Sequence, residues 1–161
     1  MLIFLIGMPG SGKSSVGKQL ASEWQIPFID MDELIEQKAQ KSIPTIFEQD
    51  GEAHFRHLEK AVLHEIIAQP LATQVIATGG GAPCFFDNMD RINQAGTSVF
   101  IDTPLYTIAQ RMTNKNQDRP LYQQADYDAM YQKLVHTFEQ RKQFYWQANI
   151  FLRAAELSIP S

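Results

Sequence analysis

Apolar residues along the chain gather in short runs that alternate with longer stretches of mixed character. The first run, residues 2–6, has no polar position, which is typical of a strand buried on both faces of a parallel sheet. Further runs predict strands at residues 26–30, 74–77, 98–102 and 149–152. Because helical stretches separate these five strands, we predict an α/β fold with three layers, α/β/α, around a five-stranded parallel sheet.

The intervening stretches carry apolar residues at helical spacing. After the first strand, Val16, Leu20 and Trp24 are four residues apart and predict a helix with one buried stripe. The longest helical stretches cover about residues 52–68 and 128–147, and the first of them has an apolar face. The polar segment 113–126 fits neither type of element. A loop of that length inside a compact domain is usually functional, so we interpret it as a lid.

The turn between the first strand and the first helix contains a phosphate-binding pattern. Residues 7–14 read Gly-Met-Pro-Gly-Ser-Gly-Lys-Ser and fit G-x-x-x-x-G-K-[ST]. Glycines let a loop turn tightly round an anion, and the start of the next helix adds N–H donors. Lys13 is placed to reach the outer phosphates of a nucleoside triphosphate, and Ser14 to ligate Mg²⁺. A glycine-rich turn without a ligand is the alternative, but the strand and helix on either side favour nucleotide binding.

Two carboxylates, Asp30 and Asp32, follow the second strand. The carboxyl ends of parallel strands gather at one edge of a sheet, so both should lie beside the phosphate loop. One such carboxylate can hold Mg²⁺ through water, and the other can accept a proton from an attacking hydroxyl. Asp32 can instead be the N-cap of a helix that begins at Glu33. Its expected position favours the functional interpretation.

Other charged residues and glycines are candidates with open alternatives. Arg56 and Glu59 are i,i+3 neighbours, so the carboxylate can orient the guanidinium, although a solvated surface pair is more common. Residues 79–81 are all glycine and indicate a close approach of the backbone to a ligand, or a bulge or sharp turn. Arg119 in the predicted lid can cover a γ-phosphate, and Arg141 can bind a carboxylate. A surface position is the alternative for both arginines.

Composition excludes several classes of function. The 161 residues suffice for one domain, and a net charge of −4 leaves no general basic surface for nucleic acid. An anionic substrate would therefore be bound by a few placed arginines. The one cysteine, Cys84, excludes an intramolecular disulfide, and no run suits a membrane span or a signal peptide. We expect a monomeric, cytoplasmic protein that binds neither nucleic acid nor membranes.

Three further patterns do not change this interpretation. Residues 99–102 resemble a Walker B strand, but Asp102 can simply end a strand. Residues 114–118 resemble the guanine-reading Asn-Lys-x-Asp motif, but the aspartate is one residue too far along and the segment follows a helix, so we favour adenine. The histidines lack partners at metal-ligand spacing and are interpreted as surface residues.

Several motifs, taken in order, resemble those of the shikimate kinases, small P-loop kinases with the architecture of nucleoside-monophosphate kinases. The set consists of residues 7–14, Asp30-Met31-Asp32, Phe55-Arg56 with Glu59, Gly79-Gly80-Gly81, Arg119-Pro120-Leu121, and Arg141 followed by Tyr145 and Ala148. The resemblance covers the chain up to about Asn149. It implies a P-loop NTPase fold with a lid and the sheet order 2-3-1-4-5. It also implies transfer of the γ-phosphoryl of ATP to the 3-hydroxyl of shikimate, in the route to chorismate and aromatic amino acids.

The resemblance implies roles for single residues. The catalytic residues would be Lys13, Asp32 as the base for the 3-hydroxyl, and Arg119, which closes with the lid onto ATP. The nucleotide would contact Gly10, Ser11, Gly12, Lys13, Ser14, Ser15, Arg119 and Arg111, the last against adenine. Arg56 and Arg141 would clamp the carboxylate of shikimate. Its other contacts would be Asp32, Glu59, Gly79, Gly80 and Gly81. Mg²⁺ would be held by Ser14 and, through water, by Asp30.

Two alternatives remain beside this interpretation. Gluconate also carries a carboxylate, so another small-metabolite kinase such as a gluconate kinase would fit the same arginines. A nucleotide-dependent switch that transfers no phosphate is the alternative from a different class, although it would need neither Asp32 nor the lid arginine. The family pattern continues past the fifth strand into an adenine-contacting loop and a final helix. This chain has only residues 153–161 there, so no nucleotide contact is assigned to them.

Overall fold

The fold is built on a five-stranded parallel sheet, seen in a computed structural model that describes residues 1–69, 72–114 and 123–153. The strand order is β2-β3-β1-β4-β5, which confirms the predicted order, and every neighbouring pair is parallel. The strands are β1 (Leu2–Ile6), β2 (Phe28–Asp30), β3 (Gln74–Ala77), β4 (Gly96–Asp102) and β5 (Ile150–Arg153). Each predicted strand is present, with bounds that shift by at most two residues at its start.

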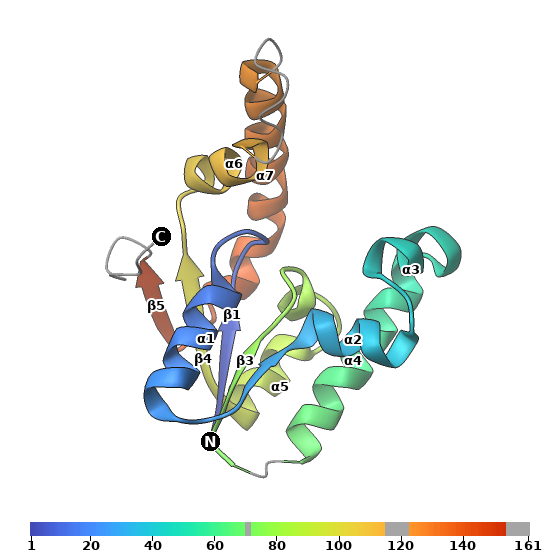
Figure 1. Cartoon of the computed structure of the whole chain (residues 1–161), viewed down its shortest axis with the longest axis vertical. Helices are drawn as coiled ribbons and strands as arrows, with labels where there is room; N and C mark the ends of the chain where they lie inside the picture. The colour runs from blue at the N-terminus through green and yellow to red at the C-terminus, as the bar shows by residue number, and fades with distance from the viewer. Residues whose placement is uncertain (70–71, 115–122, 154–161) are drawn as a thin grey trace.

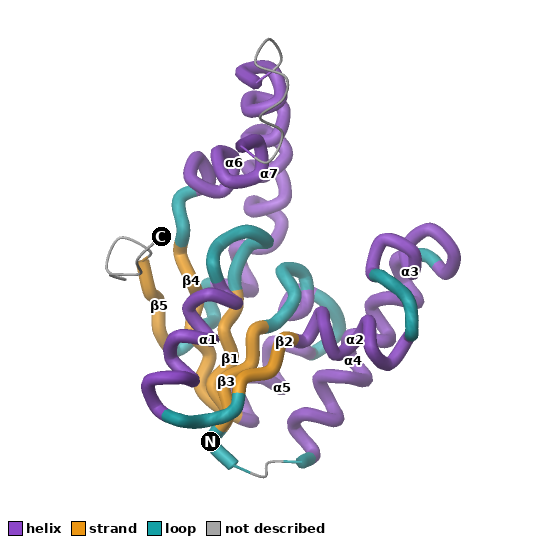
Figure 2. Tube along the Cα trace, in the orientation of Figure 1, coloured by secondary structure: helices purple, strands orange, loops and turns teal. Residues whose placement is uncertain are grey.

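Helices cover both faces of the sheet, which confirms the three layers (Figures 1 and 2). They are α1 (Lys13–Trp24), α2 (Met31–Ala39), α3 (Ile43–Asp50), α4 (Glu52–Ala68), α5 (Asn88–Ala95), α6 (Leu105–Thr113), α7 (Gln123–Tyr145) and the 3₁₀ turn η1 (Ala82–Cys84). On one face Ile3 and Leu5 of β1 pack against α1. On the other, Leu2 and Phe4 pack against α2, α4 and α5.

Strand β1 lies in the middle of the sheet and is buried throughout. Successive side chains of a strand point to opposite faces, so a strand covered on both sides must be apolar at every position. A third apolar cluster joins Ile6 and Phe100 to α5, α6 and α7, where the Phe100 ring stacks on Tyr145 with centroids 5.2 Å apart. This cluster fixes the end of α7 against the sheet.

The structure corrects the buried stripe predicted for the first helix and the start predicted for the last long helix, which begins at Gln123. Trp24 is 55% exposed, and the buried stripe of α1 follows Val16, Gly17 and Ala21 instead. A spacing of four residues drifts by about 40° per step on a helix of 3.6 residues per turn, so Trp24 has rotated off the stripe. The predicted lid, residues 113–126, lies mostly outside the described residues, and its last four residues form the first turn of α7.

The loops after β1 and β3 and the start of α2, which follows β2 directly, meet at the carboxyl edge of the sheet, as parallel topology requires (Figure 1). Helices α6 and α7 rise above that edge, and α3 projects to one side with the start of α4. Within the described residues, no helix is long and apolar enough to cross a membrane.

Gly96 provides a test of how tightly β4 packs on β1. It pairs with Leu2, and a Cβ at Gly96 would lie only 2.1 Å from the Leu2 carbonyl oxygen. Because the obstructing atom belongs to the central strand, we expect Gly96→Ala to lower the free energy of unfolding by about 3 kcal/mol or more in urea denaturation.

Gly51→Ala is the matched control. No described atom lies within 4 Å of its Cβ position, but its φ is +86°. With a ψ of 167° this conformation is essentially confined to glycine, so backbone strain alone should cost about 2 kcal/mol. A loss below about 1 kcal/mol in Gly96→Ala would show that close packing at Gly96 contributes little.

Candidate active site

The phosphate-binding pattern forms a loop that only glycine allows. Gly7, Gly10 and Gly12 have φ of +148°, +79° and +101°, conformations that residues with a Cβ rarely adopt. Gly12 is the N-cap of α1, which has no side-chain cap and no acidic residue in its first turn. The positive end of the helix dipole therefore faces the loop without a carboxylate from α1 itself to offset it, which favours a bound anion.

Lys13 is buried beneath this loop and is held by it. Its Nζ donates to the carbonyl oxygens of Gly7, at 2.8 Å, and Met8, at 2.9 Å. Burial lowers the pKa of Lys13 to about 8. The charge of Arg141 also lowers this pKa, whereas the charges of Asp32 and Asp30 raise it. The ammonium group is thus positioned inside the loop before any phosphate arrives.

Asp30 joins the starts of two helices. Its Oδ2 accepts a hydrogen bond from Ser14 Oγ at 3.0 Å, and its Oδ1 accepts from the backbone N–H groups of Asp32 and Glu33. Asp30 is therefore the N-cap of α2, and the alternative that Asp32 caps this helix is wrong. Since Asp30 already binds the free N–H groups of the first turn, the Asp32 side chain is left for another role.

The Asp32 carboxyl group has the electrostatics of a general base. It is half-buried, and burial raises its pKa, as does the neighbouring charge of Asp30; Lys13 and Arg56 act in the opposite direction. A carboxylate with a raised pKa accepts a proton more readily than an ordinary one. Its position between Lys13 and Arg56 places it between the phosphate loop and α4.

Arg56 and Glu59 form a buried pair, so the alternative of a solvated surface pair is wrong. They are 8% and 1% exposed, and Nη1 of Arg56 lies 3.0 Å from Oε1 of Glu59. Burial raises the pKa of Glu59, and the charge and hydrogen bond of Arg56 offset only part of this rise. Nη2 of Arg56 lies 3.5 Å from the exposed Glu52, and Nε is buried with no hydrogen-bond partner among the described residues.

Each glycine of the triplet makes room for a different part of the site. A Cβ at Gly79 would lie 2.9 Å from both Asp32 Oδ1 and Glu59 Oε2. One at Gly80 would lie 2.6 Å from the Pro9 ring, and one at Gly81 would lie 2.7 Å from both terminal nitrogens of Arg56. None of the three has a positive φ. The triplet is therefore explained by crowding from functional side chains and not by a special backbone conformation.

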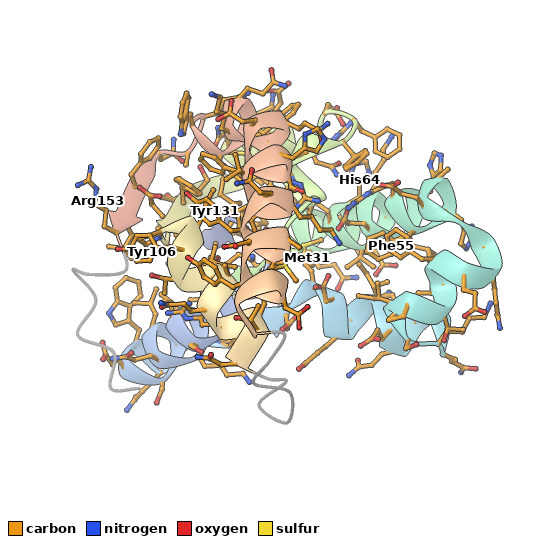
Figure 3. All side chains as sticks on the ribbon, turned by 90° about the horizontal axis from the view of Figure 1, so that it is seen from above. Met31, Phe55, His64, Tyr106, Tyr131 and Arg153 are labelled. Atoms are coloured by element: carbon orange, nitrogen blue, oxygen red, sulfur yellow. The ribbon has the colours of Figure 1, made fainter. Side chains whose placement is uncertain are left out.

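Arg141 approaches the same triplet from α7. Its Nη1 is buried, has no hydrogen-bond partner in the described part of the chain, and lies 3.1 Å from the Cβ position of Gly80. A simple surface position is thus wrong. One turn along, the Tyr145 hydroxyl donates to the Gly80 carbonyl at 2.5 Å. Figure 3 looks down on this edge, with α7 crossing it and the helices of Met31 and Phe55 on one side.

Two contacts to the phosphate loop were not foreseen from the sequence. Thr103 follows β4, is buried, and donates from Oγ1 to the Ser11 carbonyl at 2.7 Å. Arg111 of α6 donates from Nη1 to the Gly10 carbonyl at 2.9 Å. Of the remaining nucleotide candidates, Gly10 and Ser15 are exposed at the loop, while Arg119 lies outside the described residues.

Other reactive groups do not form a second centre. The described residues hold no group of three or more His, Cys, Asp or Glu that could bind a metal ion. His54, His57 and His136 are exposed as expected, whereas His64 is partly buried. Burial raises the pKa of the Cys84 thiol to about 11, so it stays protonated at neutral pH.

The site as a whole can hold two anions opposite each other. The phosphate loop with Lys13 lies on one side, and Arg56 and Arg141 present unpartnered nitrogens on the other. The Asp32 carboxyl group interacts with Lys13 of the first side and Arg56 of the second. This arrangement suits transfer of a phosphoryl group to a hydroxyl of a small organic acid.

The lowered pKa of Lys13 predicts a pH dependence of stability. The unfolded chain holds this proton up to pH 10.5 and the folded chain only to about 8. Between these values the unfolded state binds more protons, so wild-type stability should rise with pH relative to Lys13→Met, by at most about 3 kcal/mol. Urea unfolding of both proteins from pH 7 to 10.5 measures this; a constant difference would contradict the burial of the charge.

Comparison with known proteins agrees with this geometry. The family model described as shikimate kinase matches residues 9–160. A shikimate kinase of Bacteroides fragilis is 44% identical over 155 residues, which cover 96% of this chain and 86% of that protein.

Solved structures give the same result. The shikimate kinase of Bacteroides thetaiotaomicron superposes with a TM-score of 0.87 at 38% identity, covering 99% of this chain and 89% of that one. That of Acinetobacter baumannii, solved in complex with shikimate, gives 0.78 at 34% identity, covering 94% and 82%. A gluconokinase of Sinorhizobium meliloti, at 17% identity and a TM-score of 0.55, covers 98% and 83% and shows a common fold alone. The chain has the P-loop NTPase fold and belongs to the shikimate kinase family.

Proposed function

We propose that the protein transfers the γ-phosphoryl group of ATP to the 3-hydroxyl of shikimate, giving shikimate 3-phosphate and ADP. The observation that carries this proposal is the pair of guanidinium groups, Arg56 and Arg141, that flank the glycine triplet opposite the phosphate loop. Each retains a buried nitrogen without a hydrogen-bond partner among the described residues. A small acid with one carboxylate and a hydroxyl would satisfy both nitrogens and Asp32 together.

The carboxylate of shikimate is bound by the two arginines. Glu59 holds Nη1 of Arg56. The opposite edge of this guanidinium, Nε with Nη2, has only the long contact of Nη2 with the exposed Glu52, and can instead make two parallel hydrogen bonds to a carboxylate. Arg141 adds a second cation from α7. The glycines at 79–81 let the ring of the acid approach the backbone closely and offer it N–H groups.

Asp32 accepts the proton of the 3-hydroxyl as that oxygen attacks the γ-phosphorus of ATP. Lys13 then lies on the phosphate side and offsets the charge of the transferring group. To do so, its ammonium exchanges the carbonyl oxygens of Gly7 and Met8 for phosphate oxygens. The family resemblance gives Arg119, outside the described residues, the role of covering the phosphates of ATP, and it gives Arg111 a contact with adenine.

Ser14 and Asp30 fit a magnesium ion. Their oxygens are hydrogen-bonded to each other at 3.0 Å beside the phosphate loop, and Mg²⁺ is ordinarily bound by one or two protein oxygens together with phosphates and water. Asp30 would act through water because its two oxygens already accept hydrogen bonds. Bound there, the ion would neutralise charge on the phosphates of ATP.

We further infer that the protein works as a monomer in the cytoplasm. Lys13, Asp32, Arg56 and Arg141 come together from one chain, so no second copy is needed to complete the site. ATP is made in the cytoplasm, and the unpaired Cys84 suits its reducing conditions.

The identity of the acceptor is tested by a coupled assay of ADP release with shikimate, gluconate and nucleoside monophosphates. We expect kcat/KM for shikimate to exceed that for gluconate by at least about a hundredfold, because the site's polar groups match one arrangement of hydroxyls. Similar values for the two acids would favour a less selective metabolite kinase. ATP consumption unaffected by any acceptor would instead indicate a nucleotide switch.

The glycine triplet allows the base and the carboxylate clamp to be disturbed to different degrees. Gly79→Ala places a methyl group against Asp32 and also against Glu59, which holds Arg56, so we expect kcat to fall by about a hundredfold together with a rise in the KM for shikimate, and the KM for ATP to stay unchanged. Gly81→Ala displaces the guanidinium of Arg56, so we expect the KM for shikimate to rise by roughly tenfold or more with a smaller change in kcat. The same kinetic change in both variants would contradict this division of roles.

A further inference from the structure

The guanidinium of Arg56 is in contact with aromatic rings as well as with carboxylates. Its Cζ lies 4.1 Å from the centroid of the Phe85 ring and 5.2 Å from that of Phe55. Phe55 is the neighbour of Arg56 on α4, but Phe85 comes from the turn after η1, on a separate segment of the chain. A cation within 6 Å of a ring face is attracted by the negative face of the ring.

The polar contacts of Arg56 do not fix the plane of its guanidinium. Nη1 donates one hydrogen bond to Glu59, whereas the contact of Nη2 with the exposed Glu52 is long, at 3.5 Å. One short hydrogen bond leaves a planar group free to turn about the line between donor and acceptor. The face of the Phe85 ring lies against the group and restricts that rotation.

The turn that carries Phe85 is itself held in place. Asn88 is fully buried and donates from Nδ2 to the Ala82 carbonyl at 2.9 Å. Phe86 has a φ of +52°, which is a true outlier for a bulky residue and persists only where the surroundings hold it. Its ring lies 4.6 Å from Nζ of Lys60 and 5.0 Å from the His57 ring.

Phe85 and Phe86 therefore contact the same helix, α4, from one turn of the chain. Phe85 contacts Arg56, and Phe86 contacts His57 and Lys60, all three on α4. This fixes the distance between the turn and α4, and with it the place of the Phe85 ring over the guanidinium.

We propose that Phe85 is a positioning residue for substrate binding: its ring sets the plane of the Arg56 guanidinium and excludes water from one of its faces, so that the Nε–Nη2 edge meets the carboxylate of the acid. This inference rests on the proposed function, in which Arg56 binds that carboxylate. A ring in this role keeps the cation ordered before the acid arrives and thereby improves its binding.

The first test replaces the ring by an aliphatic side chain. We expect Phe85→Leu to raise the KM for shikimate about threefold to tenfold and to leave the KM for ATP within about twofold of wild type. Phe86→Leu is the comparison variant, because it removes a ring from the same turn that contacts Lys60 and His57 and not Arg56; acting only through the turn, it should raise the KM for shikimate less than Phe85→Leu does. Equal effects of the two substitutions on the KM for shikimate would overturn the proposal.

The second test keeps the size of the ring and changes its charge distribution. Phenylalanine analogues with one, two and three fluorines at position 85 should raise the KM for shikimate stepwise, since fluorine withdraws charge from the ring face. A merely structural ring would give no such trend, and a flat series overturns the proposal even where Phe85→Leu fails to fold.

A double-mutant cycle locates the effect on Arg56. In an Arg56→Ala background, Phe85→Leu should cause no further loss of kcat/KM for shikimate, whereas an additive loss would show that the ring acts elsewhere. The outcomes also separate the two proposals. Wild-type protein that does not phosphorylate shikimate overturns the proposed function and this inference together, whereas wild-type turnover with an unaffected Phe85→Leu overturns the inference alone.

Discussion

Charged side chains buried close together impose the main constraint on this structure. Lys13, Arg56 and Arg141 face Asp30, Asp32 and Glu59 at one edge of the sheet, where burial opposes the charge of Lys13, Asp32 and Glu59. A buried charge is tolerated only near an opposite charge or in hydrogen bonds, so Lys13, Asp32 and Glu59 depend on the opposite charges around them for their ionised forms. The parallel sheet makes the arrangement possible, because it brings the ends of β1, β2 and β3 to one place.

This crowding explains features that look unrelated along the chain. The glycine triplet lies where Asp32, Glu59, Arg56 and Pro9 leave no room for a side-chain carbon. The Tyr145 hydroxyl reaches the same triplet from the far end of α7 and ties that helix to β3. The apolar clusters around β1 hold the backbone rigid beneath these contacts, which is what a site of closely spaced charges needs.

The sequence was most informative where the evidence is local. An unbroken apolar run predicts β1, and the spacing of Gly12, Lys13 and Ser14 after it predicts the phosphate loop, because both depend on neighbouring residues alone. The burial of Arg56 with Glu59 was not predictable, since an exposed i,i+3 ion pair on a surface helix has the same sequence pattern as a buried one. The alternative that Asp32 caps α2 was placed two residues too late, because either aspartate could serve as the cap and only the backbone decides. Contacts such as Phe85 over Arg56 or Thr103 on Ser11 join distant segments and leave no periodic signal.

Asp30 uses its two carboxylate oxygens for two different helices: one binds the hydroxyl of Ser14 in α1, the other the free N–H groups that open α2. The first turns of both helices thus share a single rigid corner. The arginines proposed to bind the acceptor lie on other helices, α4 and α7, so they can be replaced without disturbing that corner. Acceptor preference can accordingly change over evolutionary time while the chemistry of phosphate transfer is kept.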